Sequence, residues 1–231
     1  MNESLPRLSY DESLSCVCTQ SLAQFREDCV LFPLFHSLTG STYGRFVELG
    51  ALDGYSISNT YALERCVRWK GLLIEANPSS FEKLRKSDRI AAKEHAAVCR
   101  GSGYVNITKH GNQYAGIPET MSQSYVRRWG RRIPERTTVV TVPCRSLTSM
   151  MLDNHISEAE FLSLDVQGAE ETVLRATDLA MFKVVMVEMD GLDRTKDRRV
   201  DAILRAAGFL EAEKRFRVPY SRVYVVNKSH S

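Results

Sequence analysis

The sequence lacks long apolar runs and a strong charge of either sign. Its densest apolar stretch, Val30–Phe35, is short and contains Pro33, so it is far below the length of a membrane span. A net charge of +3 on 231 residues does not by itself call for a nucleic acid or an anionic membrane as partner. The first residues include Glu3, Asp11 and Glu12 and do not follow a positive-then-apolar secretion pattern. We therefore expect a cytoplasmic chain without a membrane span.

The spacing of cysteines that is typical of zinc sites is also missing. Cys16 and Cys18 are separated by one residue, which is too close for the usual zinc half-site, and no CxxC pair follows. An even number of cysteines is compatible with three disulfides. However, a chain of this length can build a sufficient core without them, and no secretion signal is present. We predict reduced thiols at all six positions: Cys16, Cys18, Cys29, Cys66, Cys99 and Cys144.

The sequence alternates short apolar segments with amphipathic ones. The apolar segments predict strands at 46–49, 71–75, 96–98, 105–109, 138–142, 161–165, 184–188 and 222–226. The amphipathic segments predict helices at 55–65, 77–86, 169–176 and 200–207. This alternation predicts an α/β fold with a mostly parallel sheet and helices on both faces. No repeat or low-complexity linker divides the chain, so we expect one domain over residues 41–231, preceded by a mainly helical segment over residues 1–40.

The first predicted strand ends in an acidic, glycine-containing turn. In parallel sheets, ligands bind at the carboxyl ends of the strands. Gly50 and Gly54 allow the backbone to approach a ligand closely, but they do not form a GxGxxG pattern. Glu48 and Asp53 would repel a pyrophosphate, whereas they suit the ammonium and sulfonium groups of S-adenosylmethionine. The alternative is an ordinary strand-to-helix turn with solvated acids.

Glu75 ends the second predicted strand, 25 residues after Gly50. A carboxylate at this position can accept hydrogen bonds from both ribose hydroxyls, which NAD and S-adenosylmethionine share. Together with the acidic first turn, it favours the sulfonium cofactor. As an alternative, Glu75 can cap the next helix, but Asn77 is able to do so by itself.

At these positions the sequence resembles the FkbM family of methyltransferases. The resemblance runs from about Arg45 to Val226, and its best blocks are Phe46–Gly54 with Ser58-Asn59-Thr60, Trp69–Pro78 and Leu164–Glu170. It implies a Rossmann-like class I methyltransferase fold with a seven-stranded sheet over residues 41–231. It also implies S-adenosylmethionine as cofactor and, usually, O-methylation of hydroxyl groups.

The resemblance also implies roles for single residues. Glu48, Gly50, Asp53 and Asn59 would surround the methionine end of the cofactor, in the same segment as Gly54 and Ser58. Glu75 would hold the ribose, Ala76 and Asn77 would border the adenosine, Ala97 would lie beside adenine, and Asp165 would lie near the methyl group. The sequence departs from the family at Gln167, where an acid is usual, and after Glu188, where Met189 and Asp190 replace a frequent histidine.

Transfer of a methyl group to a hydroxyl requires alignment of the reactants and removal of a proton. The candidate bases are Asp165, Glu188, Asp190, His95 and His110, of which Asp165 and then Glu188 are best placed. The three acids end neighbouring strands and can share a divalent ion. Because carboxylates that face a sulfonium need no metal, we predict none.

A basic insert separates two of the predicted strands. It contains Trp129 and five arginines: Arg127, Arg128, Arg131, Arg132 and Arg136. This composition can bind nucleic acid, but a solvated helix face is the favoured interpretation. We therefore expect a small-molecule or sugar hydroxyl as acceptor. The alternatives are an RNA or protein methyltransferase and a non-catalytic binding module with the same fold, and the oligomeric state is left open.

Overall fold

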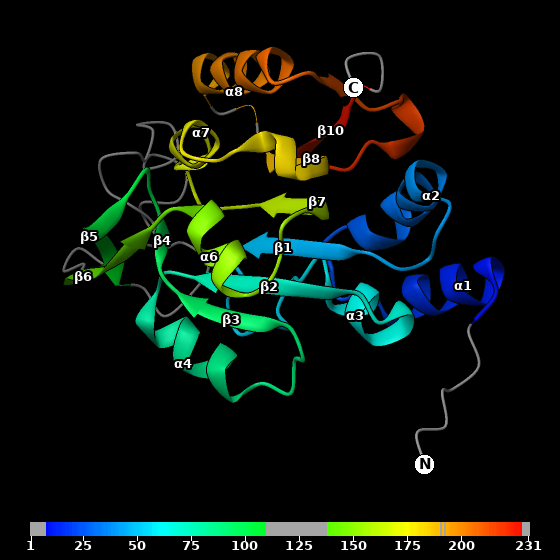
Figure 1. Cartoon of the computed structure of the whole chain (residues 1–231), viewed down its shortest axis with the longest axis horizontal. Coiled ribbons are helices and arrows are strands. Elements are labelled where there is room, and N and C mark those ends of the chain that lie inside the picture. Colours follow the sequence, from blue (N-terminus) through cyan, green and yellow to red (C-terminus); the bar gives the residue numbers. More distant parts are fainter. Residues whose placement is uncertain (1–7, 110–137, 190, 192, 228–231) are drawn as a thin grey trace.

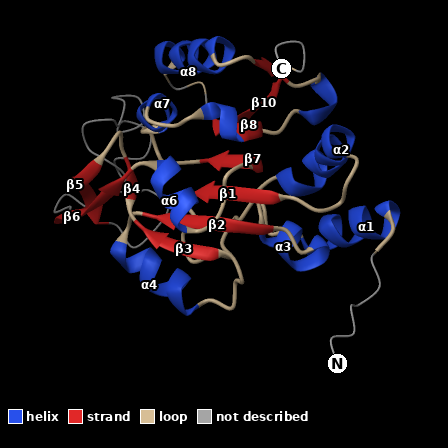
Figure 2. Ribbon diagram, in the orientation of Figure 1, coloured by secondary structure: helices blue, strands red, loops and turns tan. Residues whose placement is uncertain are grey.

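The computed structural model describes residues 8–109, 138–189, 191 and 193–227. Its main feature is a seven-stranded sheet with the order β3-β2-β1-β7-β8-β10-β9 (Figures 1 and 2). The strands β1, β2, β3, β7 and β8 pair in parallel, while β10 is antiparallel to both of its neighbours. In chain order the strands are β1 Arg45–Leu49, β2 Lys70–Glu75, β3 Ala92–His95, β7 Ala159–Leu164, β8 Phe182–Glu188, β9 Phe209–Glu211 and β10 Ser221–Val226.

Helices cover both faces of this sheet. One face packs against α1 Tyr10–Gln20, α2 Glu27–Thr39, α3 Tyr61–Val67 and α4 Pro78–Lys86. The other packs against α6 Leu147–Asp153, α7 Glu170–Arg175 and α8 Arg194–Ala206. The prediction of an α/β fold with a seven-stranded, mostly parallel sheet is therefore confirmed. None of the helices in the described ranges has both the length and the apolar character needed to cross a bilayer.

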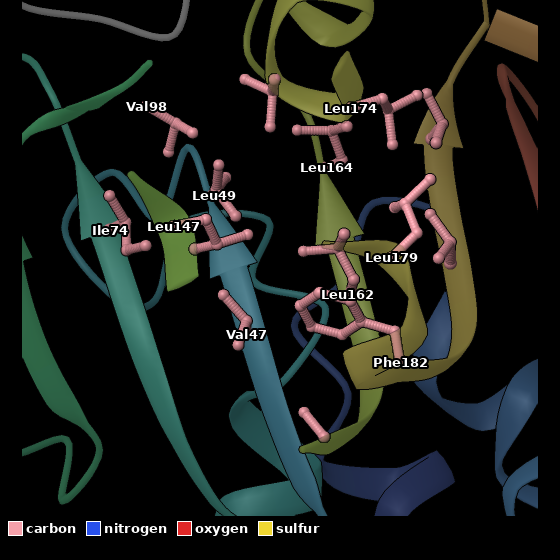
Figure 3. Packing of buried hydrophobic residues seen from close by; sticks show 14 of the residues in the cluster. Val47, Leu49, Ile74, Val98, Leu147, Leu162, Leu164, Leu174, Leu179 and Phe182 are labelled. Atoms are coloured by element: carbon pink, nitrogen blue, oxygen red, sulfur yellow. The ribbon is translucent and has the colours of Figure 1, made fainter. Parts of the chain in front are cut away.

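The alternation of side chains along β1 divides the core into two layers. Val47 and Leu49 point to one face, where they pack with Leu162 and Leu164 of β7 and with Leu147 of α6 (Figure 3). Complete burial of one such side chain contributes about 1.5–3 kcal/mol. On the other face, Phe46 and Phe161 pack in one cluster with α2 and α3. The helices within residues 1–40 thus belong to the same core as the sheet.

A second, three-stranded sheet lies beyond the carboxyl ends of the central strands (Figure 1). It consists of β4 Ala97–Val98, β6 Thr138–Arg145 and β5 Ser102–Lys109, in that order. Its small apolar cluster contains Ala97 and Ile107 and packs against Ala76, which follows β2. The small sheet therefore forms a wall at the ligand-binding edge of the large one.

The helix predicted at residues 55–65 begins only at Tyr61. Ile57 has a left-handed backbone with φ of 52°, which interrupts a helix. Glu48 accepts hydrogen bonds from the Ser58 hydroxyl and from the Asn59 amide, at 2.9 and 2.8 Å. A buried carboxylate from the neighbouring strand therefore determines the backbone here, and the local apolar spacing does not.

The prediction of six reduced thiols is wrong. The structure pairs Cys16 with Cys66, Cys18 with Cys29, and Cys99 with Cys144. The packing of α1 on α2 and α3 brings the first two pairs to Cα distances of 5.8 and 4.6 Å, which a disulfide can bridge. The third pair links the segment after β4 to β6. These contacts connect distant segments, so cysteine spacing along the chain did not reveal them.

Candidate functional site

The strand order reverses between β1 and β7, and a cleft opens at the carboxyl ends of these strands. We call this cleft the first cavity. Its volume is about 780 Å³, a value that includes the open solvent at its mouth. Three segments that follow strands form much of its wall, at residues 50–57, 75–77 and 165–169, and the small sheet closes one side. Of the cofactor-binding residues expected from the sequence, those that line the first cavity are Gly50, Glu75, Ala76, Asn77, Ala97 and Asp165.

Glu75 lies at the end of β2 and is buried. Its two carboxylate oxygens accept hydrogen bonds from the backbone amides of Leu52 and Asn77, at 2.8 and 2.7 Å. Burial raises the pKa of Glu75 to about 7, although these amides favour the ionised form. The Ala76 amide also favours the ionised form, and since a carboxylate has about four acceptor positions, Glu75 can still accept from a further hydroxyl donor.

The side chain of Glu48 does not line the first cavity. It is buried on the face of β1 that carries Phe46, and its oxygens accept from Ser58, Asn59 and Thr60. Glu48 therefore fixes the segment between β1 and α3. Asn59 in turn donates to the hydroxyl of Ser163 on β7 at 3.0 Å. The Oδ1 atom of Asn59 is buried and has no hydrogen-bond partner within the described part of the chain.

Asp53 and Gly54 also stabilise this segment from outside the cavity. Asp53 accepts from the amides of Tyr55 and Ser56 at 3.0 and 2.7 Å. Burial opposes its ionisation, but these bonds outweigh that effect and lower the pKa of Asp53. The Gly54 carbonyl accepts from Arg89, a buried residue paired with Glu64 at 3.1 Å.

Asp165 and Glu188 lie at the ends of β7 and β8 and share a hydrogen bond between their carboxyl groups. Two carboxyl groups can share such a bond only when one of them carries a proton. Burial, followed by the charge of Glu170, raises the pKa of Asp165. Gln167 also donates to Asp165 at 2.8 Å. The pair can therefore hold or accept one proton.

A second cavity lies on the other side of Asp165. Counted in the same way, its volume is about 400 Å³. Asp165 and Ile57 line both cavities, and Asn59 and Glu188 line only the second. Part of its wall comes from the segment before α2 and the first residue of α2, with Gln24, Phe25 and Glu27. Another part comes from the turn before β10 and the first residue of β10, with Pro219, Tyr220 and Ser221. A group in one cavity can therefore approach a group in the other beside Asp165.

Several candidates have other contacts. Glu170 is buried, pairs with Lys196 at 2.8 Å and accepts from the Gly168 amide at 2.9 Å, so it shapes the turn after β7. His95 bonds to the Ala76 carbonyl at 3.1 Å and stacks on Phe81. Asp190, His110 and the basic insert Arg127–Arg136 lie outside the described residues. In the ranges that are described, no group of three or more metal-ligating side chains comes together.

The sequence missed much of the apolar lining of the first cavity. This lining comes from Leu49, Leu52, Ile57, Ile74, Ala96, Val98, Ile107, Val166, Ala169 and Val173. These residues resemble core residues in the sequence, and the strands predicted for several of them did not indicate that they line a cavity. Nothing in the sequence indicated Arg89, because its partners come from segments 25 to 35 residues away.

The chain was compared with models of known protein families. The model of the methyltransferase FkbM domain matches residues 48–211, which is more than half of the chain. The match begins at the carboxylate of β1 and ends with β9, so it includes every cavity-lining strand end from β1 to β8. No curated protein sequence matches the chain significantly.

Solved structures with a similar fold are distant in sequence. The methyltransferase FkbM from Methylobacillus flagellatus KT has a TM-score of 0.47 at 11% identity, over 92% of this chain and 58% of that one. The O-methyltransferase TomG from Streptomyces achromogenes, solved with its cofactor SAM, has a TM-score of 0.41 at 14% identity, over 97% and 93%. Fibrillarin from Aeropyrum pernix, with natively bound S-adenosyl-L-methionine, has a TM-score of 0.41 at 12% identity, over 84% and 74%.

Proposed function

The chain belongs to the FkbM methyltransferase family, and we propose that it transfers the methyl group of S-adenosylmethionine to a hydroxyl group of a small molecule or sugar. The observation that carries this proposal is the carboxyl pair of Asp165 and Glu188. Burial raises the pKa of Asp165, which lies at the junction of two adjoining cavities, and Glu188 lines the second cavity beside it. Such a pair suits a reaction in which a hydroxyl loses its proton next to a bound cofactor.

The first cavity fits the cofactor. Glu75 supplies a carboxylate for the ribose hydroxyls, and the apolar side chains of Ala97, Val98 and Ile107 suit an adenine ring. Glu48 and Asp53 support this site by holding residues 53–60 in place, since their own oxygens are occupied by that segment.

The residues also account for the course of the reaction. S-adenosylmethionine supplies a methyl group already activated by its positive sulfur. As the bond between the acceptor oxygen and the methyl carbon forms, the bond between carbon and sulfur breaks, and the hydroxyl proton must leave. The ionised member of the Asp165–Glu188 pair takes that proton. Such general-base assistance typically contributes 10²–10⁴-fold to the rate.

The three disulfides indicate the kind of cellular compartment in which the protein folds. The cytoplasmic localisation and the reduced thiols were both expected from the lack of a secretion pattern, whereas the structure pairs all six cysteines. Disulfides persist in oxidising compartments and are rare in the reducing cytosol. We infer that the chain acquires its structure in an oxidising compartment.

Two measurements test the proposed function. Calorimetric titration with S-adenosylmethionine should show binding that Glu75→Ala weakens by roughly tenfold to a hundredfold, since at least one charge-assisted hydrogen bond is lost. Transfer from methyl-labelled cofactor into a fractionated cell extract should label small molecules. Cofactor binding without transfer would favour a binding module, and label in RNA or protein would favour the alternative substrate classes. Unchanged affinity in folded Glu75→Ala would refute the cofactor assignment.

A further inference from the structure

The second cavity adjoins the proposed reacting centre but shares only Ile57 and Asp165 with the first cavity. Alternation along β7 and β8 places Asp165 and Glu188 on the sheet face that carries Phe161, Val184 and α2. The second cavity therefore opens on the α2 side of the sheet. A molecule bound there would meet the methyl group of a cofactor in the first cavity without competing for the same space.

The wall formed by residues 23–27 is held in a defined position. Ala23 forms a parallel β-bridge with Ile57, and the ring of Phe25 contacts that of Tyr220, with the ring centres 5.5 Å apart. The buried Glu27 accepts from the Phe25 amide at 2.8 Å. The disulfide between Cys18 and Cys29 closes the whole segment into a loop. The wall is therefore suited to discriminate between ligands.

The charges that face the second cavity all have one sign. Three carboxyl groups line it, from Glu27, Asp165 and Glu188, together with the side-chain amides of Gln24 and Asn59. Among the described residues, no lysine, arginine or histidine lines it. An anionic ligand would meet uncompensated repulsion in a partly buried space. Hydroxyl and ammonium groups would find acceptors, and the adjacent rings of Phe25 and Tyr220, tilted by 47° to each other, offer apolar contacts.

We propose that the second cavity is the acceptor subsite, and that it selects a neutral or cationic hydroxyl-bearing small molecule over phosphorylated or carboxylated ones. The segment from Gln24 to Glu27 provides the selecting wall. This inference rests on the proposed methyl transfer, and it adds the charge class of the acceptor and the residues that recognise it.

The test separates a cell extract on an anion-exchange column before the labelling reaction. The unretained fraction, which contains neutral and cationic small molecules, should receive the label from methyl-labelled S-adenosylmethionine. The retained fraction contains sugar phosphates, uronic acids and nucleic acids, and it should receive little. Transfer mainly into the retained fraction would overturn the acceptor subsite.

Two substitutions in the same loop test the wall itself. Gln24 lines the cavity and Leu22 does not, and both side chains are exposed, so neither change should impair folding. Gln24→Ala should raise the amount of unretained fraction needed for half-maximal rate by roughly threefold to tenfold, the usual effect of one lost hydrogen bond. Leu22→Ala should leave that amount unchanged, and both variants should bind S-adenosylmethionine normally in calorimetry.

An equal response of the two variants would overturn the role of the wall. The proposed function fails separately: absence of cofactor binding, or of transfer into every fraction, would refute methyl transfer and the acceptor subsite with it.

Discussion

Gly50 lies so close to Asp165 that a Cβ atom added to the glycine would be 2.0 Å from the aspartate's backbone carbonyl oxygen. Gly50 also has a left-handed backbone with φ of 81°, which disfavours any side chain. The contact joins the ends of β1 and β7, the two strands between which the first cavity opens. The position of the Asp165 carboxyl group therefore depends on the absence of a side chain at residue 50.

Gly50→Ala is expected to damage both stability and cofactor binding. Overpacking costs about 1–3 kcal/mol, and the left-handed backbone adds about 1–2 kcal/mol. Thermal unfolding and calorimetry measure the two effects. Gly101→Ala is the matched control, because an added Cβ at Gly101 would meet nothing within 4 Å. Equal unfolding temperatures for the two variants would contradict the close approach.

Asp165→Asn should separate proton transfer from cofactor binding. Asparagine keeps the shape but cannot take the proton of an acceptor hydroxyl, so the rate should fall by about 10²–10⁴ while affinity for S-adenosylmethionine changes little. Single-turnover kinetics with the labelled acceptor measures the rate. A parallel fall in affinity would show that the carboxylate acts mainly on the sulfonium. Normal rate and affinity together would leave Glu188 as the next candidate base.

Cofactor affinity should depend on pH through Glu75. Its pKa in the folded protein is about 7, and ribose hydroxyls bind the ionised form better. Affinity for S-adenosylmethionine should therefore rise several-fold between about pH 6 and pH 8. Because the cofactor's own ammonium group also titrates, the informative quantity is the difference between the wild type and Glu75→Gln, whose affinity should be lower and less dependent on pH. If the affinities of the wild type and Glu75→Gln changed with pH in the same way, Glu75 would be excluded as the titrating group.

Asp28 should make the fold less stable as the pH rises. It is fully buried, its Oδ2 atom has no partner among the described residues, and burial raises its pKa from 3.8 to about 7. A raised folded-state pKa means that ionisation favours the unfolded chain, so stability present below about pH 4 is lost as the pH approaches 7. The loss is on the order of 4 kcal/mol at most.

Asp28→Asn should remove this dependence. Asparagine can still accept from the Ser21 hydroxyl and the Cys29 amide. Urea denaturation at several pH values should show that the variant gains stability relative to the wild type between pH 4 and pH 7. Asp11→Asn, at an exposed position in α1, should show no such gain. A constant difference between wild type and Asp28→Asn across this range would refute the prediction.

All six cysteines should resist alkylation in the oxidised protein. Mass measurement after denaturation without reductant should find no modified cysteine, and six after reduction. The loops closed by the disulfides span 50, 11 and 45 residues, so each bond should stabilise the fold by about 3–4 kcal/mol through the unfolded state. Alkylation of the unreduced protein would contradict the pairing and would again favour the cytoplasm.

The sequence predicted the parts of the fold that depend on local pattern. The apolar runs ending at Leu49, Glu75 and Asp165 marked three buried strands, and their carboxyl ends do meet at one cleft. It failed where a distant side chain determines the local backbone. Glu48 holds residues 58–60 out of a helical conformation, and helix packing pairs Cys16 with Cys66 across 50 residues.

The same limit applies to the site. An acidic residue at the end of a predicted strand was a sufficient signal to predict that Glu75 and Asp165 line the first cavity. It did not distinguish them from Glu48 and Asp53, because all four are acids at or just after the end of a predicted strand. The distinction depends on which amides and hydroxyls each carboxylate meets after folding. The second cavity was not predictable, since its wall comes from the helical segment that the sequence separated from the catalytic domain.

The disulfide between Cys16 and Cys66 changes how the chain is connected. It joins α1 to α3 across the linker of residues 40–44, part of which is exposed. A protease that cut this linker would separate the segment that contains α1 and α2 from the rest of the sequence, but the two pieces would remain one covalent molecule. The nicked protein would migrate as a single species until a reductant was added. The segment that contributes Gln24, Phe25 and Glu27 to the second cavity would thus stay attached to the protein after its peptide link to β1 had been cut.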